Sequence, residues 1–290
     1  MMDMPQWKRI EGADAQMRSC SRDGVTYLTF PLLDAAEGFG HAVSTRMGGV
    51  STGWFSTLNM APGGKDDPEL VRENHRRFAA AVGYDPEREV CSAQTHTVNV
   101  RRVGPEDLGC GYSRPRPYTD VDGLITDMPG VALLTFYADC VPLILIDPVR
   151  RAVGCAHSGW RGTVADMGGS VLRAMHEAFG TDPADVLAGI GPCICQDCYE
   201  VSGDVIGQVD AAFSEEIRSS LYYRKENGKY QLDLREACRQ NFLRAGVPAE
   251  NIAVSDLCTA CNKDLLFSHR ATAGKRGNIA AVVLIREEEQ

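Results

Sequence analysis

Residues 131–157 read VALLTFYADCVPLILIDPVRRAVGCAH and contain three short apolar runs in close succession. The runs are Val131 to Phe136, Leu143 to Asp147 and Ala152 to Ala156, and their length and composition are typical of strands. Apolar residues are nearly continuous within each run, whereas a strand with one face in water would alternate apolar and polar residues. We therefore expect neighbouring strands of a sheet that is covered on both faces.

Further elements on both sides of this stretch give a mixed pattern. Helical periodicity is clearest in Pro68 to Val82, Asp166 to Phe179, Asp204 to Phe213 and Asp233 to Ala245. Asp166 could be an N-cap, and Asp233 with Glu236 three residues later resembles a capping box. More strands are expected at 186–190, 252–255 and 279–285, and Asn227-Gly228 predicts a hairpin turn. The pattern indicates an α/β or α+β domain.

Composition limits the classes of function. The 290 residues include 30 Lys and Arg against 39 Asp and Glu, a net charge of −9, with no basic run. Such a chain is poorly suited to nonspecific nucleic-acid binding, and small-molecule substrates fit better. The N-terminus lacks the apolar core of a signal peptide, and the longest apolar stretch, 141–146, is too short to span a bilayer. We therefore expect a cytoplasmic protein with no nucleic-acid or membrane partner.

The chain shows no sign of division into domains. It has no internal repeat and no linker, and residues 105–118 are expected to form a long surface loop. Candidate ligands lie on both sides of that loop, so we predict one domain over residues 1–290. Eleven cysteines, an odd number in a chain too long to need disulfide staples, are expected to be reduced thiols or ligands.

Three short segments each offer one metal ligand. They are AQTH (93–96), YADC (137–140) and AHSGWRG (156–162), with His96, Cys140 and His157 as the ligands. Three protein ligands leave a fourth position open, which is typical of catalytic zinc. Cys140 and His157 each follow a strand-like run, and two strand ends could bring them together. The alternative is a buried free thiol and a histidine satisfied in the core.

Two arginines are candidate anion ligands. Arg46 precedes the pair Gly48-Gly49, where a planar guanidinium and close backbone approach would suit a phosphate. Arg161, in Trp160-Arg161-Gly162, is a second candidate. The alternative for both is a solvated surface arginine.

A separate group of cysteines contains two C-x-x-C pairs. The group consists of Cys193, Cys195, Cys198, Cys258 and Cys261. The pairs are about sixty residues apart and lack the glycine-rich turns of zinc knuckles. We favour packed thiols here, with a structural zinc as the alternative. Walker A, dinucleotide-binding and H-E-x-x-H motifs are all absent from the sequence.

Taken in order, several segments resemble one family. They are Ser44 to Ser51, Leu58-Asn59, Gln94 to His96, Asp122 to Thr126, Ala138 to Pro142, His157 to Gly162, Gly189 to Pro192, Cys198 to Val201 and Cys258-Thr259. The chain resembles, over about residues 41–285, the YfiH-like family of multicopper polyphenol oxidoreductase or laccase-domain proteins. These proteins are also described as purine nucleoside phosphorylases with adenosine deaminase and methylthioadenosine phosphorylase activities. Departures from the family pattern, at Thr97, His269 and 274–277, surround the expected pocket rim.

The resemblance implies a fold and a site. The fold is a layered α/β (α+β) single domain, a central β-sandwich of mixed sheets flanked by helices, distantly similar to cysteine-dependent deamidase toxins. The metal ligands are His96, Cys140 and His157, holding Zn²⁺, with Cu²⁺ as another metal that such ligands accept. Arg46, Cys140 and His157 are the implied catalytic residues, and Arg46, Asn59 and Arg161 the substrate-binding ones.

The implied activity is that of a zinc-dependent purine nucleoside enzyme. Its partners would be phosphate and adenosine, inosine, guanosine or methylthioadenosine, and the protein would be a monomer or homodimer. For deamination, the zinc would lower the pKa of its bound water for attack on C6 of adenine. For phosphorolysis, Arg46 would grip the phosphate that attacks C1′. Asp139 is a candidate carrier of the proton that the departing ammonia needs.

Two other functions stay open at this level. A copper oxidase would need more imidazoles than six histidines without a His-x-His pair provide, although the trio could hold one copper ion. A metal-free hydrolase could use Cys140 as a nucleophile activated by His157. That enzyme would be insensitive to chelators, and its Cys140 would be alkylated rapidly.

Overall fold

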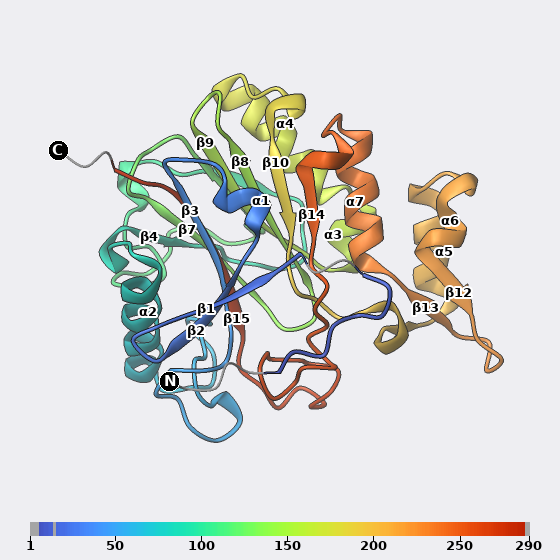
Figure 1. The fold of residues 1–290 in the computed structure, drawn as a ribbon, viewed down its shortest axis with the longest axis horizontal. Coiled ribbons are helices and arrows are strands. Elements are labelled where there is room, and N and C mark those ends of the chain that lie inside the picture. Colours follow the sequence, from blue (N-terminus) through green and yellow to red (C-terminus); the bar gives the residue numbers. More distant parts are fainter. Residues whose placement is uncertain (1–5, 14–15, 288–290) are drawn as a thin grey trace.

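Two six-stranded sheets pack face to face at the centre of the computed structural model, which describes residues 6–13 and 16–287 (Figure 1). The first sheet has the order β1 (Arg18–Arg22), β2 (Val25–Thr29), β3 (Phe39–Ser44), β15 (Ile279–Ile285), β7 (Ala132–Tyr137), β4 (Glu89–Cys91). The second has the order β14 (Ile252–Val254), β10 (Leu187–Ile190), β8 (Val141–Asp147), β9 (Ala152–Ser158), β6 (Gly123–Thr126), β5 (Val100–Arg102). Both sheets are mixed, because the pairs β4–β7, β5–β6 and β10–β14 are parallel and the other pairs antiparallel.

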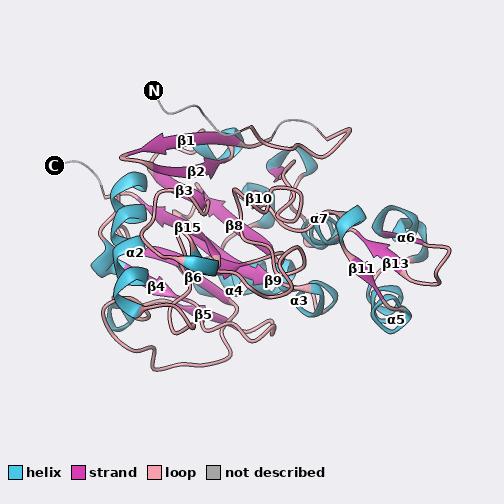
Figure 2. Cartoon of the chain, turned by 90° about the horizontal axis from the view of Figure 1, so that it is seen from below, coloured by secondary structure: helices cyan, strands magenta, loops and turns pink. Residues whose placement is uncertain are grey.

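Helices cover the outer faces of this sandwich. Helix α2 (Pro68–Val82) lies on the first sheet, and α4 (Met167–Phe179) and α7 (Leu234–Arg244) lie on the second (Figures 1 and 2). The short α1 (Pro31–Asp34) and α3 (Trp160–Val164) follow β2 and β9. To one side lies a small sheet, β11 (Glu200–Val201), β13 (Tyr230–Leu232) and β12 (Tyr222–Arg224), with α5 (Gly203–Ala212) and α6 (Glu215–Leu221) (Figure 2). Single 3₁₀ turns occupy Gly53–Phe55, Pro86–Arg88, Pro105–Asp107, Pro183–Asp185, Gln196–Cys198 and Ala249–Asn251.

The central strands supply side chains to two apolar layers at once. In β8, Leu143 and Leu145 pack under α4 and α7, while Ile144 and Ile146 enter the layer between the sheets. All four side chains are fully buried, and each contributes about 1.5–3 kcal/mol of hydrophobic stabilisation. This two-sided burial confirms the expectation drawn from the continuous apolar runs.

Most predicted elements occur within one or two residues of their expected bounds. Helix α2 and strand β15 have the bounds predicted, and the Asn227-Gly228 turn joins the antiparallel pair β12–β13. Helices α4 and α7 begin one residue after Asp166 and Asp233, because both aspartates are N-caps that accept backbone N–H bonds. The fold class is confirmed, while a single domain over residues 1–290 stays a prediction.

Strands β1 to β6 and β11 and helices α1, α3 and α6 were not predicted, although β3 has six residues and is fully buried. Strands β1 and β5, with sequences RSCSR and VRR, carry arginines on surfaces that are partly exposed, so neither forms an apolar run. Their pairing with β2 and β6 holds them in place. Among the described residues, no helix combines the length and the apolar character needed to cross a bilayer.

Candidate metal centre and active-site cavity

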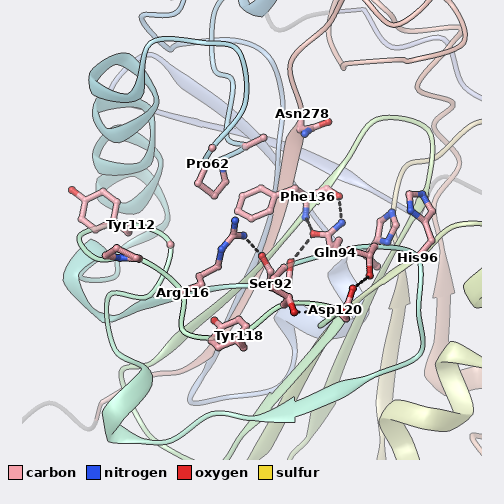
Figure 3. A pocket seen from close by; sticks show the side chains of 18 of the residues that line it. Pro62, Ser92, Gln94, His96, Tyr112, Arg116, Tyr118, Asp120, Phe136 and Asn278 are labelled. Carbon is pink, nitrogen blue, oxygen red and sulfur yellow. Dashed lines mark hydrogen bonds between the residues drawn. The ribbon is translucent and has the colours of Figure 1, made fainter.

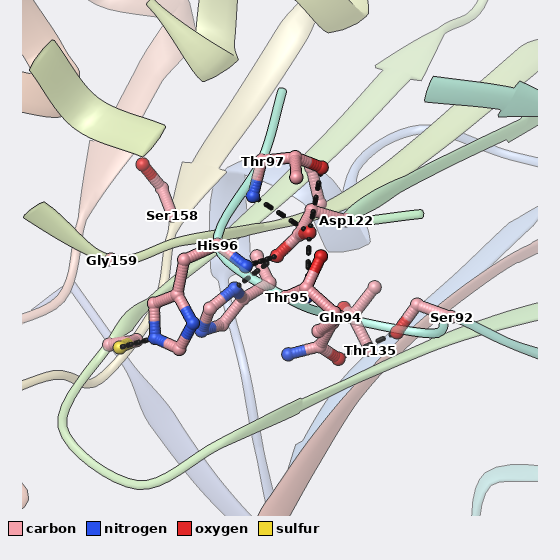
Figure 4. Close-up of polar contacts among 12 residues, drawn as sticks. Ser92, Gln94, Thr95, His96, Thr97, Asp122, Thr135, Ser158 and Gly159 are labelled. Atoms are coloured by element: carbon pink, nitrogen blue, oxygen red, sulfur yellow. Dashed lines mark hydrogen bonds and ion pairs between the residues drawn. The ribbon is translucent and has the colours of Figure 1, made fainter. Parts of the chain in front are cut away.

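His96, Cys140 and His157 converge on one point, as the sequence predicts. The Cys140 Sγ and one ring nitrogen of each histidine lie within 4.8 Å of one another, and Cys140 Sγ is 3.9 Å from His96 Nε2 (Figure 4). The two imidazole rings meet edge to face, with centroids 4.9 Å apart. His96 comes from the loop between β4 and β5, Cys140 from the connection between β7 and β8, and His157 from β9.

The connection that carries Cys140 crosses between the two sheets. Strand β7 belongs to the first sheet and β8 to the second, and Asp139 turns the chain with a φ of 88°. Pairing of Pro142 with His157 sets the register of β8 and β9, which brings the preceding Cys140 beside the imidazole. The Asp139 carboxylate holds this turn, because it accepts hydrogen bonds from Thr259 Oγ1 and the Arg270 amide, both at 2.6 Å.

A buried carboxylate orients both histidines. Asp122 Oδ1 lies 2.8 Å from His157 Nδ1, and the backbone amides of residues 95, 96 and 97 donate to the same carboxylate at 2.9–3.1 Å (Figure 4). Burial raises the pKa of Asp122, but these hydrogen bonds outweigh it and lower the pKa to about 2. The ionised carboxylate therefore accepts the Nδ1 proton of His157 and leaves Nε2 as the ring nitrogen available to a metal.

The thiol and the imidazole of the site favour each other's charged forms. Burial raises the pKa of Cys140, but attraction to His157 and hydrogen bonds to both histidines lower it to about 6. Burial lowers the pKa of His157, but Cys140 and Asp122 raise it to about 9. A thiolate is the form of cysteine that binds metals. One sulfur and two ring nitrogens, one of them oriented by a carboxylate, fit a zinc ion with an open fourth position.

Gly159 leaves room for this group. A Cβ atom at this position would lie 2.7 Å from Cδ2 of His96 and 3.2 Å from Cys140 Sγ. Any side chain would therefore push the ligands apart, so a glycine is required directly after β9.

The trio forms one end of a cavity of about 940 Å³ (Figure 3). Three aromatic side chains line it, Tyr112, Tyr118 and Phe136. So do four arginines, Arg72, Arg114, Arg116 and Arg276, in a protein whose net charge is −9. Residues 111–116 of the predicted surface loop also line the cavity, as do Arg276 and Asn278. The cavity therefore offers flat apolar surfaces and positive charge to the same ligand.

Among these four arginines, Arg276 is the one for which the contacts support a binding role. Its guanidinium donates to the Asn278 side chain, while its Nε is buried with no hydrogen-bond partner. In the sequence, residues 274–277 stand out only as a departure from the family pattern. Asp122 lies in a segment that resembles the family, but the sequence alone predicts no role for it.

The other predicted binding residues lie outside this cavity. Arg46 lines a separate hollow with Asp264, donates to the carbonyls of Ser56 and Lys263, and stacks on Phe267. Arg161 is exposed and stacks on the neighbouring Trp160 ring at 4.3 Å. The structure therefore brings the three predicted metal ligands together, and it does not bring Arg46 or Arg161 to the same cavity wall.

Asn59 does not line the cavity, but it holds the backbone of a residue that does. It is buried, and its Oδ1 accepts the Asn278 amide at 2.9 Å. Its Nδ2 donates to Asp66 at 2.9 Å, so both ends of the amide are used. Asn59 thus positions the Asn278 wall, and its predicted direct contact with substrate stays a prediction.

Comparison with known proteins identifies the family of the chain. A model of the family described as multi-copper polyphenol oxidoreductase laccase matches residues 40–286. The chain belongs to this family. The resemblance noted in the sequence and the fold expected from it are both confirmed.

Individual members of this family are similar over most of the chain. Purine nucleoside phosphorylase YlmD from Geobacillus stearothermophilus is 38% identical over 250 residues, covering 85% of this chain and 90% of the relative. Adenosine deaminase RL5, from an unknown prokaryotic organism, is 32% identical over 217 residues, covering 74% and 82%. The crystal structure of YlmD from Geobacillus stearothermophilus superposes with a TM-score of 0.86 at 35% identity, over 94% of this chain and 100% of that one.

Proposed function

We propose that this protein is a zinc-dependent purine nucleoside enzyme, which cleaves purine nucleosides with phosphate and deaminates adenosine. The observation that carries the proposal is the meeting of His96, Cys140 and His157 at the end of a cavity lined by aromatic and arginine side chains. The relatives named purine nucleoside phosphorylase and adenosine deaminase support the same substrate class. His96, Cys140 and His157 are the proposed metal ligands.

In deamination, water adds to C6 of adenine, the C6–N6 bond breaks and ammonia leaves. A zinc ion on the three ligands would lower the pKa of a bound water and so supply the nucleophile near neutral pH. Asp120 lines the cavity next to this group and is the proposed carrier of the proton for the leaving ammonia. Asp139, the carrier suggested by the sequence, uses both oxygens to hold the turn and does not line the cavity.

In phosphorolysis, a phosphate oxygen attacks C1′, the bond from C1′ to the purine breaks, and the base leaves with a proton. Arg276 is the proposed phosphate ligand, because its guanidinium lies on the cavity wall, where the Asn278 side chain orients it. Tyr112, Tyr118 and Phe136 offer faces on which a purine ring can stack.

The test of this function is adenosine turnover with phosphate present and absent, with the products separated by chromatography. We expect inosine without phosphate and free purine base with it. Removal of the metal by a chelator should stop both reactions, and added zinc should restore them. If the zinc-loaded protein yields no purine product under either condition, the proposed function is wrong.

Arg276→Gln should separate the two reactions. Loss of one charge-assisted contact of about 1.5–3 kcal/mol corresponds to a rise of roughly 10- to 100-fold in the phosphate KM. Deamination needs no phosphate and should change far less. Steady-state kinetics of both reactions on the same protein preparation would measure the split.

Two further arginine variants serve as controls. Arg173→Gln changes an exposed arginine on α4, away from the cavity, and should leave both reactions unaltered. Arg46→Gln tests the residue favoured by the sequence. If the phosphate KM is raised in Arg46→Gln and normal in Arg276→Gln, Arg46 and not Arg276 binds the phosphate.

One observation favours a second candidate, the metal-free cysteine hydrolase. Cys140, His157 and Asp122 follow one another as nucleophile, base and orienting carboxylate, with the thiol pKa lowered to about 6. That enzyme would keep its activity in chelator and lose it when iodoacetamide alkylates Cys140. A zinc enzyme would show the reverse, with Cys140 protected until the metal is removed.

A multicopper oxidase is less compatible with the site. Within residues 6–13 and 16–287, no group of candidate ligands contains more than two histidines. His75 is in another group, and both of its ring nitrogens already pair, with Glu89 and with the Met60 carbonyl. One copper ion on the trio is chemically reasonable, but a cluster of several would lack imidazoles.

A further inference from the structure

Four cysteines converge outside the cavity, at a place where two distant loops meet. Cys195 and Cys198 lie in the loop between β10 and β11, and Cys258 and Cys261 in the loop after β14. Cys195 and Cys258 are 63 residues apart in the sequence. All four Sγ atoms nevertheless lie within 4.8 Å of one another. The fifth cysteine of this region, Cys193, is not a member of the group.

Backbone contacts align the two loops. Residue 193 pairs with residue 258 in a parallel β-bridge, and the Thr259 amide donates to the Cys193 carbonyl at 3.0 Å. This pairing places one C-x-x-C segment beside the other. From the sequence alone packed thiols are favoured, because the pairs are far apart and lack glycine-rich turns, but in the fold each loop supplies half of a four-cysteine group.

The spacing of the sulfurs is that of ligands on one ion. Four sulfurs at about 2.3 Å from a tetrahedral zinc are about 3.8 Å apart. Cys198 Sγ and Cys261 Sγ are 3.6 Å apart, and all four residues are free thiols. A disulfide would need a separation of about 2.05 Å, so the group has the spacing of a metal site.

Backbone amides point at one of the sulfurs. Cys258 Sγ accepts hydrogen bonds from the Cys195 amide at 3.2 Å and from the Cys261 amide at 3.4 Å. These two bonds fix the position of Cys258 Sγ within the group.

Exposure falls from one side of the group to the other. Cys195 and Cys258 are buried, Cys198 is half-buried and Cys261 is exposed. An ion could therefore enter from the Cys261 side and be enclosed by the other three sulfurs. With all four positions filled by protein, no place is left for water or substrate, as in structural zinc sites.

We propose that Cys195, Cys198, Cys258 and Cys261 bind a second zinc ion in a closed, structural site. The site would tie the loop after β14 to the loop after β10. From that loop, Thr259 and Arg270 hold the Asp139 carboxylate, and Asp139 precedes the metal ligand Cys140. The second zinc would thus stabilise the turn that presents Cys140. Binding of this zinc does not depend on which reaction the cavity catalyses.

The test measures zinc per chain in purified variants. We expect about two zinc ions in the wild type and about one in the double variant His96→Ala/His157→Ala, which keeps only the cysteine site. X-ray absorption at the zinc edge of that variant should show sulfur ligands alone. Cys198→Ser/Cys261→Ser should also hold about one, with nitrogen ligands present, and Cys20→Ser, which changes a half-buried thiol on β1, should hold two.

A labelling experiment on the wild type covers the case in which the cysteine variant does not fold. Iodoacetamide should leave all four cysteines unmodified in the native protein and modify the exposed Cys261 first once a chelator has removed zinc. Two results would overturn the proposal. One is a double histidine variant that is free of zinc. The other is a native protein in which these cysteines form disulfides, seen as the loss of two hydrogens per bond in the mass of the unreduced chain.

Discussion

His96→Ala should lower purine turnover by at least about 10³-fold, because the proposed catalytic zinc would supply several kcal/mol of barrier reduction. Two ligands would remain, Cys140 and His157, and a pair holds zinc much more weakly than a trio. His96 is exposed on the cavity side of the site, so its truncation leaves the apolar layers untouched and the protein should fold. Turnover and bound zinc, measured on the same sample, should fall together.

The matched control for this change is His176→Ala. His176 is an exposed histidine near the end of α4, and it belongs to none of the candidate ligand groups. The His176→Ala protein should keep full turnover and the zinc content of the wild type. Wild-type activity in a His96→Ala protein that has lost this zinc would contradict the metal mechanism and favour Cys140 with His157 as a hydrolase.

Asp122→Asn should damage both the metal site and the fold. The carboxylate accepts from three backbone amides, from Thr97 Oγ1 at 3.0 Å and from His157 Nδ1. In asparagine, an NH₂ group replaces one carboxylate oxygen and cannot accept a hydrogen bond. The groups that donate to that oxygen would therefore lose their acceptor. We expect zinc affinity to fall roughly 10- to 100-fold, the usual loss when the partner of a ligating histidine is removed. The free energy of unfolding should fall by about 3 kcal/mol, because a buried charged network is broken.

Zinc competition with a chelator and denaturant unfolding measure the two effects. Asp120→Asn is the control for zinc affinity, since Asp120 is exposed and accepts only from neighbours such as Thr95 Oγ1. Its zinc affinity should be unchanged even if its turnover falls. Equal zinc affinities in Asp122→Asn and the wild type would show that His157 does not need the carboxylate to bind metal.

Local sequence signals were sufficient for the longer helices and for the strands with continuous apolar runs, but not for β1 to β6. The apolar run 279–285 gives a strand with those bounds, because every residue of β15 is buried between two layers. Asp67, Asp166 and Asp233 cap their helices through bonds to amides two or three residues away, so each start depends on neighbouring residues alone. The same holds for the turn at Asn227-Gly228, where Gly228 has a φ of 78°.

The candidate site was only partly accessible to this kind of reasoning. His96, Cys140 and His157 were found because each ends a strand-like run or lies in a segment that resembles the family. No local sequence pattern predicts the roles of Asp122 and Arg276 or the close approach of the four cysteines. Their roles depend on contacts across the chain, such as the 35 residues between Asp122 and His157.

By itself, then, the sequence determined the strands that are buried on both faces, the capped helices and the types of ligand available. These properties follow from side-chain volume, hydrophobicity and short-range hydrogen bonding. Only the tertiary structure decided which ligands share an ion, which arginine lines the cavity and which loops adjoin. Such choices depend on strand register and on the crossing between sheets at Asp139, where Pro142 pairs with His157 and sets the position of Cys140.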